Sequence, residues 1–184
     1  MQPIPDVTVG DCRAEDVADL EAALPAGRAH ETQHARAAAG LIDYLVAKVA
    51  NGDPVGTAVI HWDGYHDGDV ADQLGPIPEI ATVHVAERAR SRGVGTALIA
   101  EAECRIAGRG HPRVCLGVGL DNARAQALYE RLGYTDTGLR STVTYTWTDA
   151  VGADQVATET DRAMVKSLST HPAALERSQV TRPG

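Results

Sequence analysis

Two glycines that follow a basic stretch are the most informative chemical signal in the sequence. Residues 83–98 read VHVAERARSRGVGTAL, in which a strand-like pattern is followed by three arginines and then by Gly93 and Gly95. The first backbone N–H groups of a helix are unpaired and attract anions, and glycine lets a ligand approach the backbone closely. The pattern predicts a pyrophosphate-binding loop, although a glycine-containing turn with solvated arginines would show the same letters. A dinucleotide fingerprint is excluded because Leu98 stands where its third glycine is required, and the sequence contains no Gly-Lys-Ser/Thr P-loop.

A second motif, NARAQALYERLGY, covers residues 122–134. Its apolar positions Ala125, Leu128, Tyr129 and Leu132 follow the spacing i, i+3, i+4 and i+7, which is one face of a helix. By periodicity alone, Tyr129 is a core residue. A buried phenol still needs a hydrogen-bond partner, so the motif predicts a polar cleft beside this helix.

The segment HETQH at residues 30–34 fits the H-E-x-x-H pattern, in which two histidines one helical turn apart bind zinc and the glutamate activates water. Arg28 and Arg36 flank it closely, and no third ligand is signalled downstream. We interpret the segment as a chance match on a solvated helix and expect no metal, with a zinc metalloprotease kept as a distant alternative. Either histidine could instead shape a substrate site.

The residues around these motifs predict alternating strands and helices. Apolar spacing indicates the type of each element, and glycine and proline mark the ends. We expect strands at residues 7–9, 41–50, 55–62, 79–85, 114–118, 141–148 and 158–168, helices at 14–24, 29–39, 93–107 and 122–132, and a loop at 61–78. The strand–helix–strand order in the middle implies a parallel pair with a right-handed crossover, whereas hairpins at both ends imply antiparallel pairing. The sheet is therefore expected to be mixed.

The composition limits the classes of partner. The 184 residues carry a net charge of −8 and 4% aromatic side chains, which disfavours nucleic acid and suits cationic or amine partners. No window approaches the ~18 apolar residues of a membrane span, and the chain does not open with a signal-peptide pattern. The cysteines, Cys12, Cys104 and Cys115, are odd in number and lack metal-ligand spacing. We expect a soluble cytoplasmic protein, bacterial in view of its arginine-rich and lysine-poor composition, with one domain at residues 1–168 and a disordered tail at 169–184.

Together the two motifs resemble those of the GNAT superfamily of acyl-CoA N-acyltransferases. The segment RSRGVG at residues 90–95 follows a strand, and the 122–134 motif comes one helix and one strand later. The strands EIATVHV at 79–85 and RAMVKSL at 162–168 are similar to the same family. Each piece is weak alone, but their order and spacing are specific, and the resemblance covers residues 41–168. It implies a single-domain α/β fold whose mixed, mostly antiparallel sheet contains one splayed parallel strand pair and is flanked by helices.

The resemblance implies that acetyl-CoA is the acyl donor and binds in the gap between the 79–85 and 114–118 strands. Its pantetheine would pair with the strand backbone near Val83 and Val85, and Asn122 would touch the pantetheine arm. The pyrophosphate would be held by the backbone N–H groups of Arg90, Ser91, Arg92, Gly93, Val94, Gly95 and Thr96. The arginines of this stretch could neutralise phosphates, but alternation prevents all of them from facing one ligand.

The same resemblance places Tyr129 at the general-acid position, where a phenol protonates the departing thiolate. Glu79 stands where relatives often carry a carboxylate that acts as a base through water, although a glutamate at the start of a strand is also common on surfaces. His84 is the reserve base.

The implied reaction is direct attack of a primary amine, preferably on a small molecule, on the acetyl-CoA thioester, without a metal or a covalent enzyme intermediate. The alternatives are acetylation of a protein or peptide N-terminus and a CoA-binding regulator without activity. A homodimer is possible, because relatives are often dimers.

Overall fold

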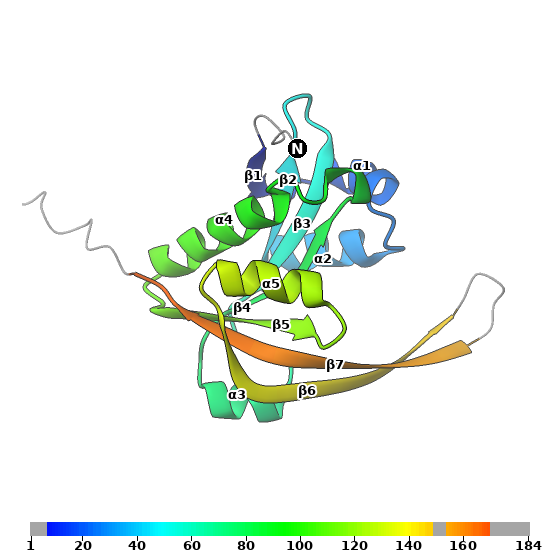
Figure 1. Cartoon of the computed structure of the whole chain (residues 1–184). Coiled ribbons are helices and arrows are strands. Elements are labelled where there is room, and N and C mark those ends of the chain that lie inside the picture. Colours follow the sequence, from blue (N-terminus) through cyan, green and yellow to red (C-terminus); the bar gives the residue numbers. More distant parts are fainter. Residues whose placement is uncertain (1–6, 149–153, 170–184) are drawn as a thin grey trace, which may run out of the picture.

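Seven strands form one mixed sheet, and helices cover both of its faces (Figure 1). The computed structural model describes residues 7–148 and 154–169. Within them the β4–β5 pair is the parallel one and the other pairs are antiparallel, which confirms the predicted sheet. The order across the sheet is β1-β2-β3-β4-β5-β7-β6, with β1 (Thr8–Asp11), β2 (Ile42–Lys48), β3 (Pro54–His61), β4 (Glu79–Val85), β5 (Arg113–Gly119), β6 (Thr135–Thr148) and β7 (Asp154–Ser167).

The helices lie on opposite faces of the sheet because side chains alternate along each strand. A Cβ added to Gly56 of β3 would lie 3.1 Å from side chains of Leu98 and Val94, so this face of β3 meets the helix that carries them. Tyr44 of β2 points the other way and hydrogen-bonds His30. The helices are α1 (Asp16–Ala23), α2 (Ala29–Ala38), α3 (Gly68–Leu74), α4 (Val94–Gly108) and α5 (Ala123–Arg131), with the short 3-10 helix η1 (Glu87–Ala89) before α4.

The parallel strands β4 and β5 separate after a short paired stretch. Their register contains the pairs Glu79–Cys115 and Ile80–Leu116. Further along, β4 continues to pair with β3 through a bulge at residues 82 and 83. Thr82 has a φ of 47°, which is unusual for a β-branched residue and marks the bulge as a strained position. The backbone of residues 81–85 thus has no strand partner on its β5 side, as the splayed pair predicted.

Two of the predicted boundaries are wrong. The 61–78 stretch contains α3, which begins where the Asp67 side chain accepts hydrogen bonds from the N–H groups of Asp69 and Val70. Val70 and Leu74 then pack into a small second core with Tyr65 and Ile77. Periodicity missed this helix because it is only two turns long and is dominated by Asp and Gly.

The last two strands begin earlier than predicted, at Thr135 and Asp154. A register shift between Asp136 and Arg140 accommodates residues 135–140 within β6, ahead of the predicted start at residue 141. The predicted tail lies outside the described residues except for Ser169. No helix in the described part of the chain is long and apolar enough to cross a membrane.

Candidate active site

The gap between β4 and β5 is the centre of the candidate site. On one face of the sheet it is bordered by the start of α4 and by α5, because Gly95 lies near Leu128 and Val85. On the other face it is bordered by the loop before α3, whose Tyr65 lies over β5 at Gly117. The two faces of the sheet at this point therefore carry different residues.

The loop before α4 presents unpaired donors at one mouth of the gap. Gly93 is the N-cap of this 15-residue helix and has a left-handed φ of 90°, with no side chain that caps the helix. The N–H groups of Val94, Gly95 and Thr96 belong to the first turn, so they have no intrahelical acceptor. Such donors at the positive end of a helix bind anions, and the predicted pyrophosphate loop fits this geometry.

Gly93 and Gly95 meet different structural requirements. A Cβ on Gly95 would lie 3.4 Å from Leu128 Cδ2 and 3.9 Å from Val85 Cγ2, so side chains of α5 and β4 come close to the start of α4 at this glycine. A Cβ on Gly93 would meet nothing within 4 Å, and the requirement there is the left-handed backbone.

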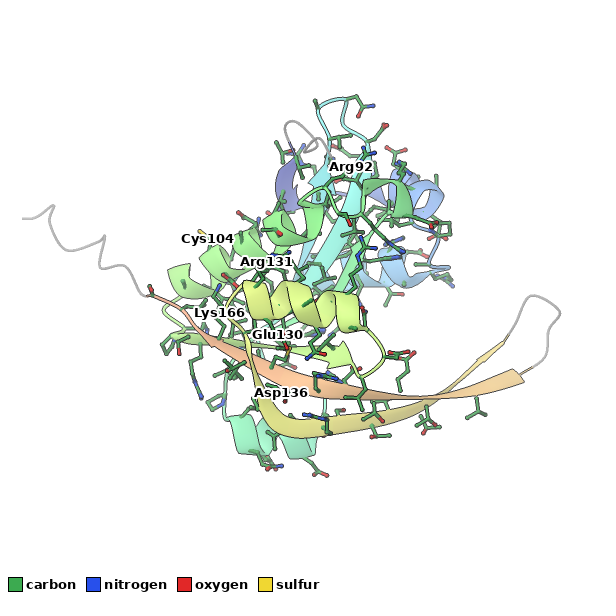
Figure 2. The ribbon with its side chains drawn as sticks, in the orientation of Figure 1. Arg92, Cys104, Glu130, Arg131, Asp136 and Lys166 are labelled. Carbon is green, nitrogen blue, oxygen red and sulfur yellow. The ribbon has the colours of Figure 1, made fainter. Side chains whose placement is uncertain are left out.

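Two of the three arginines of the loop donate hydrogen bonds to backbone carbonyl groups, and within the described residues the third does not. Arg88 reaches the Pro54 carbonyl at 3.5 Å, and Arg90 Nε donates to the Val85 carbonyl at 3.1 Å. A pantetheine amide that paired with the Val85 carbonyl would replace that second bond. Arg92 lies exposed at the turn before α4 (Figure 2), which leaves its guanidinium available to a phosphate.

Arg124 is a member of this site that the sequence analysis missed. Its guanidinium, from the first turn of α5, donates to the Ser91 hydroxyl of the loop. No local pattern indicated this contact, because the two residues lie 33 positions apart. Asn122 caps α5, since its Oδ1 accepts the Ala125 N–H at 3.1 Å, and its side-chain NH₂ group remains as a donor.

Tyr129 lies inside the fold rather than on its surface. It is 7% exposed, and its ring packs edge-on against Tyr134 at a centroid distance of 5.9 Å. Burial raises the pKa of the Tyr129 phenol to about 12, so the hydroxyl is protonated at neutral pH. This is the protonation state that the predicted role of Tyr129 as a general acid requires.

Glu79 is buried on the face opposite α4, with 1% of its surface exposed, and both carboxylate oxygens bond His66. Oε1 lies 2.9 Å from His66 Nδ1, and Oε2 accepts the His66 backbone N–H at 3.1 Å. The sequence analysis did not single out His66. The reserve base His84 pairs with Thr57 in the β3–β4 register, beyond the bulge, and its electrostatic neighbours are Arg90 and His30 rather than Glu79.

Tyr65 and Asp161 face the same strand position beside Glu79. A Cβ on Gly117 would lie 2.8 Å from the Tyr65 hydroxyl and 3.3 Å from Asp161 Oδ2. The Tyr65 side chain is buried, and its hydroxyl has no hydrogen-bond partner within the described residues. Burial raises the pKa of the Asp161 carboxyl, and the negative charge of Glu79 adds to the effect. Polar and acidic side chains thus gather on this face of β5, near the point where it separates from β4.

The HETQH segment forms part of α2, and its first histidine is committed to the fold. His30 is 4% exposed, and its ring nitrogens bond the Tyr44 hydroxyl at 2.6 Å and the Leu24 carbonyl at 2.7 Å. Zinc binding would require His30 to give up one of these bonds. The expected solvated helix is therefore wrong at this position, since His30 joins α2 to β2 and to the end of α1.

We expect His30→Ala to lower the free energy of unfolding by about 2–4 kcal/mol, because an unpaired buried group costs about 1–3 kcal/mol. The Leu24 carbonyl would lose its His30 partner, and the Tyr44 hydroxyl would keep only its bond with Thr57. Urea denaturation followed by circular dichroism measures the effect. His34→Ala, four residues along the same helix, should change stability by less than about 0.5 kcal/mol. Equal losses for the two variants would contradict the structural role of His30.

Comparison with known proteins adds a second line of evidence. A family model described as "Acetyltransferase (GNAT) family" matches residues 13–134. A mycothiol acetyltransferase from Nocardioides sp. (strain ATCC BAA-499 / JS614) is 40% identical over 78 residues, which are 41% of this chain and 26% of that protein. The chain therefore aligns with about a quarter of that relative.

Two solved structures share the fold. Naa20 from Chaetomium thermophilum, solved with a bisubstrate analogue, has a TM-score of 0.64 at 22% identity and covers 96% of this chain and 93% of its own. The acetyltransferase yncA from Salmonella typhimurium, solved with its cofactor acetyl-CoA, has a TM-score of 0.60 at 20% identity and covers 91% and 97%. At these identities the likeness concerns the fold alone.

Proposed function

The chain belongs to the GNAT family of acetyltransferases, and from this premise we propose that it transfers an acetyl group from acetyl-CoA to a primary amine of a small molecule. The observation that carries the proposal is the two-sided gap between β4 and β5. Unpaired N–H groups and the exposed Arg92 side chain lie at its α4 end, and a buried carboxylate–imidazole pair lies on the opposite face. A donor and an acceptor could therefore reach one point from two sides.

The α4 side fits a donor that carries phosphates and a narrow arm. Three helix-terminal donors and Arg92 provide positive potential for a pyrophosphate. The small Gly95 leaves the passage beside Val85 and Leu128 open for pantetheine. When bound, acetyl-CoA supplies an activated thioester. We assign this activity to a single domain at residues 1–168.

The reaction requires two proton transfers, and different residues of the chain carry them out. The amine nitrogen forms a bond to the thioester carbon as the carbon–sulfur bond breaks, and one amine proton has to leave. Tyr129 donates its phenolic proton to the departing thiolate. Glu79 and its surroundings favour removal of the amine proton on the other face. The net change is an amide and a thiol, with one proton moved from nitrogen to sulfur.

The opposite face fits a cationic acceptor. Glu79, Asp161 and Asp67 all act electrostatically on His66, so three acidic side chains lie around its ring. Within the described residues, no salt bridge joins Asp161 to a lysine or an arginine. A small amine could thus be attracted as its ammonium form, which releases one proton to water before the neutral amine attacks. A free reduced state for Cys12, Cys104 and Cys115 is compatible with a location in the cytoplasm, which we also propose.

Thiol release from acetyl-CoA across a panel of monoamines, diamines and N-terminal peptides tests this function. We expect amine-dependent release that is highest for small amines with a second positive charge. Asp161→Asn should raise the KM for the amine by about tenfold or more, since a charge-assisted contact contributes about 1.5–3 kcal/mol, while the KM for acetyl-CoA stays unchanged. Acetyl-CoA binding without release for any amine would identify a CoA-binding regulator, and peptide preference would identify a protein acetyltransferase.

A further inference from the structure

The contact between His66 and Glu79 is more specific than a surface ion pair. The Glu79 side chain is 2% exposed, whereas that of His66 is 39% exposed. One residue satisfies both oxygens of the buried carboxylate, through its backbone N–H and its ring. An incoming amine can therefore reach the imidazole without displacing any contact of Glu79.

We propose that His66 is the base that accepts the proton of the attacking amine and that Glu79 is a positioning residue that acts through the His66 ring. This inference rests on the proposed acetyl transfer and deepens it, because it identifies the proton acceptor on the amine side of the gap. It also changes the role expected for Glu79, which was a carboxylate that acts through water.

The hydrogen bonds determine which ring nitrogen is available. An ionised carboxylate can only accept hydrogen bonds, so Nδ1 carries the proton that lies against Glu79 Oε1. In the neutral ring Nε2 then has the free lone pair. A carboxylate that orients an imidazole and stabilises its charged form is the arrangement by which many enzymes strengthen a histidine base.

The position of the ring is suited to this role. It stacks on the Tyr65 ring with centroids 4.4 Å apart, and the Tyr65 hydroxyl lies over Gly117, where β5 has begun to diverge from β4. Asp161 faces the same opening from β7. The amine would be held between Asp161 and the imidazole, next to the gap that receives the thioester.

His66 and Tyr129 together accept and supply the protons that the reaction requires. His66 Nε2 takes one proton from the amine nitrogen as the C–N bond forms and becomes an imidazolium stabilised by Glu79. Tyr129 gives its proton to the thiolate as the C–S bond breaks. Exchange with water then returns a proton from His66 to Tyr129, which restores both residues.

The groups around His66 predict the sign of the pH dependence. The hydrogen bond to Glu79 raises the pKa of His66, Asp161 and Asp67 raise it further, and burial opposes them. His61 of β3 also faces this cluster, and burial lowers its own pKa, so it is neutral over the range in which His66 titrates. Because a base must be unprotonated, kcat/KM should rise with pH through a value above the ordinary imidazole pKa. Removing the charge of Glu79 should move that rise to lower pH.

Two variants, compared by their kcat and by the pH dependence of their activity, test the proposal. For an amine that the wild type acetylates, His66→Gln should lower kcat by about 10²-fold and abolish the acidic limb of the pH profile, in line with loss of a general base. Glu79→Gln should keep the limb but shift it to lower pH, with a smaller loss of kcat. Acetyl-CoA affinity, measured by calorimetry, should be the same in both variants as in the wild type.

Nitrogen NMR of the His66 ring provides a readout that does not depend on turnover. We expect the Nδ1–H tautomer at high pH and a His66 pKa that falls in Glu79→Gln. The opposite tautomer, an unchanged pKa, or an acidic limb that persists in His66→Gln would overturn the proposal. Failure of the proposed function would look different, because the wild type would then acetylate no amine while the NMR result stands independently.

Discussion

Tyr129→Phe should lower kcat by about 10²–10⁴-fold, the range typical of a lost general acid, and should leave the KM for acetyl-CoA nearly unchanged. The substitution keeps the ring that packs against Tyr134 and removes only the hydroxyl. The pKa of Tyr129 is raised to about 12 by burial, so the wild-type phenol stays protonated through the working pH range. At any pH below about 12, a loss of activity should therefore not result from deprotonation of Tyr129.

Tyr134→Phe is the matched control for this experiment. It removes the same group from the neighbouring ring in the same core, 5.9 Å away between centroids. Steady-state kinetics with the best amine of the panel should show wild-type kcat for Tyr134→Phe within a fewfold. A Tyr129→Phe enzyme that keeps most of its kcat would show that Tyr129 is only a packing residue.

Gly95→Val should weaken acetyl-CoA binding by up to about 10²-fold, because overpacking a tight site costs about 1–3 kcal/mol. The Cβ position already lies 3.4 Å from Leu128, so the two methyl groups of valine would enter the passage between α5 and β4. Calorimetry measures the affinity, and circular dichroism establishes that the fold is intact.

Gly95→Ala and Gly93→Ala separate the two requirements of the loop. Alanine at 95 fits within ordinary contact distance, so we expect a small effect on affinity. Alanine at 93 meets no atom but must adopt a φ of 90°, which should lower stability by about 1 kcal/mol and disturb the N–H donors. Wild-type affinity in Gly95→Val would contradict the assignment of the passage to the donor.

Local patterns predicted the elements that are long or strongly marked. β4 has the predicted bounds of 79 and 85, and the starts of α4 and α5 follow Gly93 and Asn122, which are their N-caps. In each case the signal is contained in neighbouring residues, because turn letters and apolar periodicity reflect the same backbone geometry that forms the element. The α3 helix escaped prediction because two turns with weak helix formers are stabilised by tertiary burial, not by propensity.

The candidate site divides in the same way. The glycine loop and Tyr129 could be identified from sequence, since each lies within one continuous motif that carries both its geometry and its chemistry. The partner of Glu79 could not, because His66 lies 13 positions earlier in a stretch expected to be loop. The same is true of Arg124, which crosses from α5 to Ser91, and of His30, whose zinc-like spacing is occupied by bonds to Tyr44 and Leu24.

The sequence by itself determined the mixed sheet with its parallel pair and the glycine loop, because period, spacing and order are properties of the chain. The splay of the parallel pair was implied by the resemblance of the two motifs to a known family. Only the tertiary structure decided that the buried Glu79 carboxylate belongs to His66, that Tyr65 and Asp161 meet over Gly117, and that His30 holds α2 to the sheet. These contacts join residues far apart in the chain, and burial decides which of them form, since a buried polar group must find its partner wherever the fold brings one within reach.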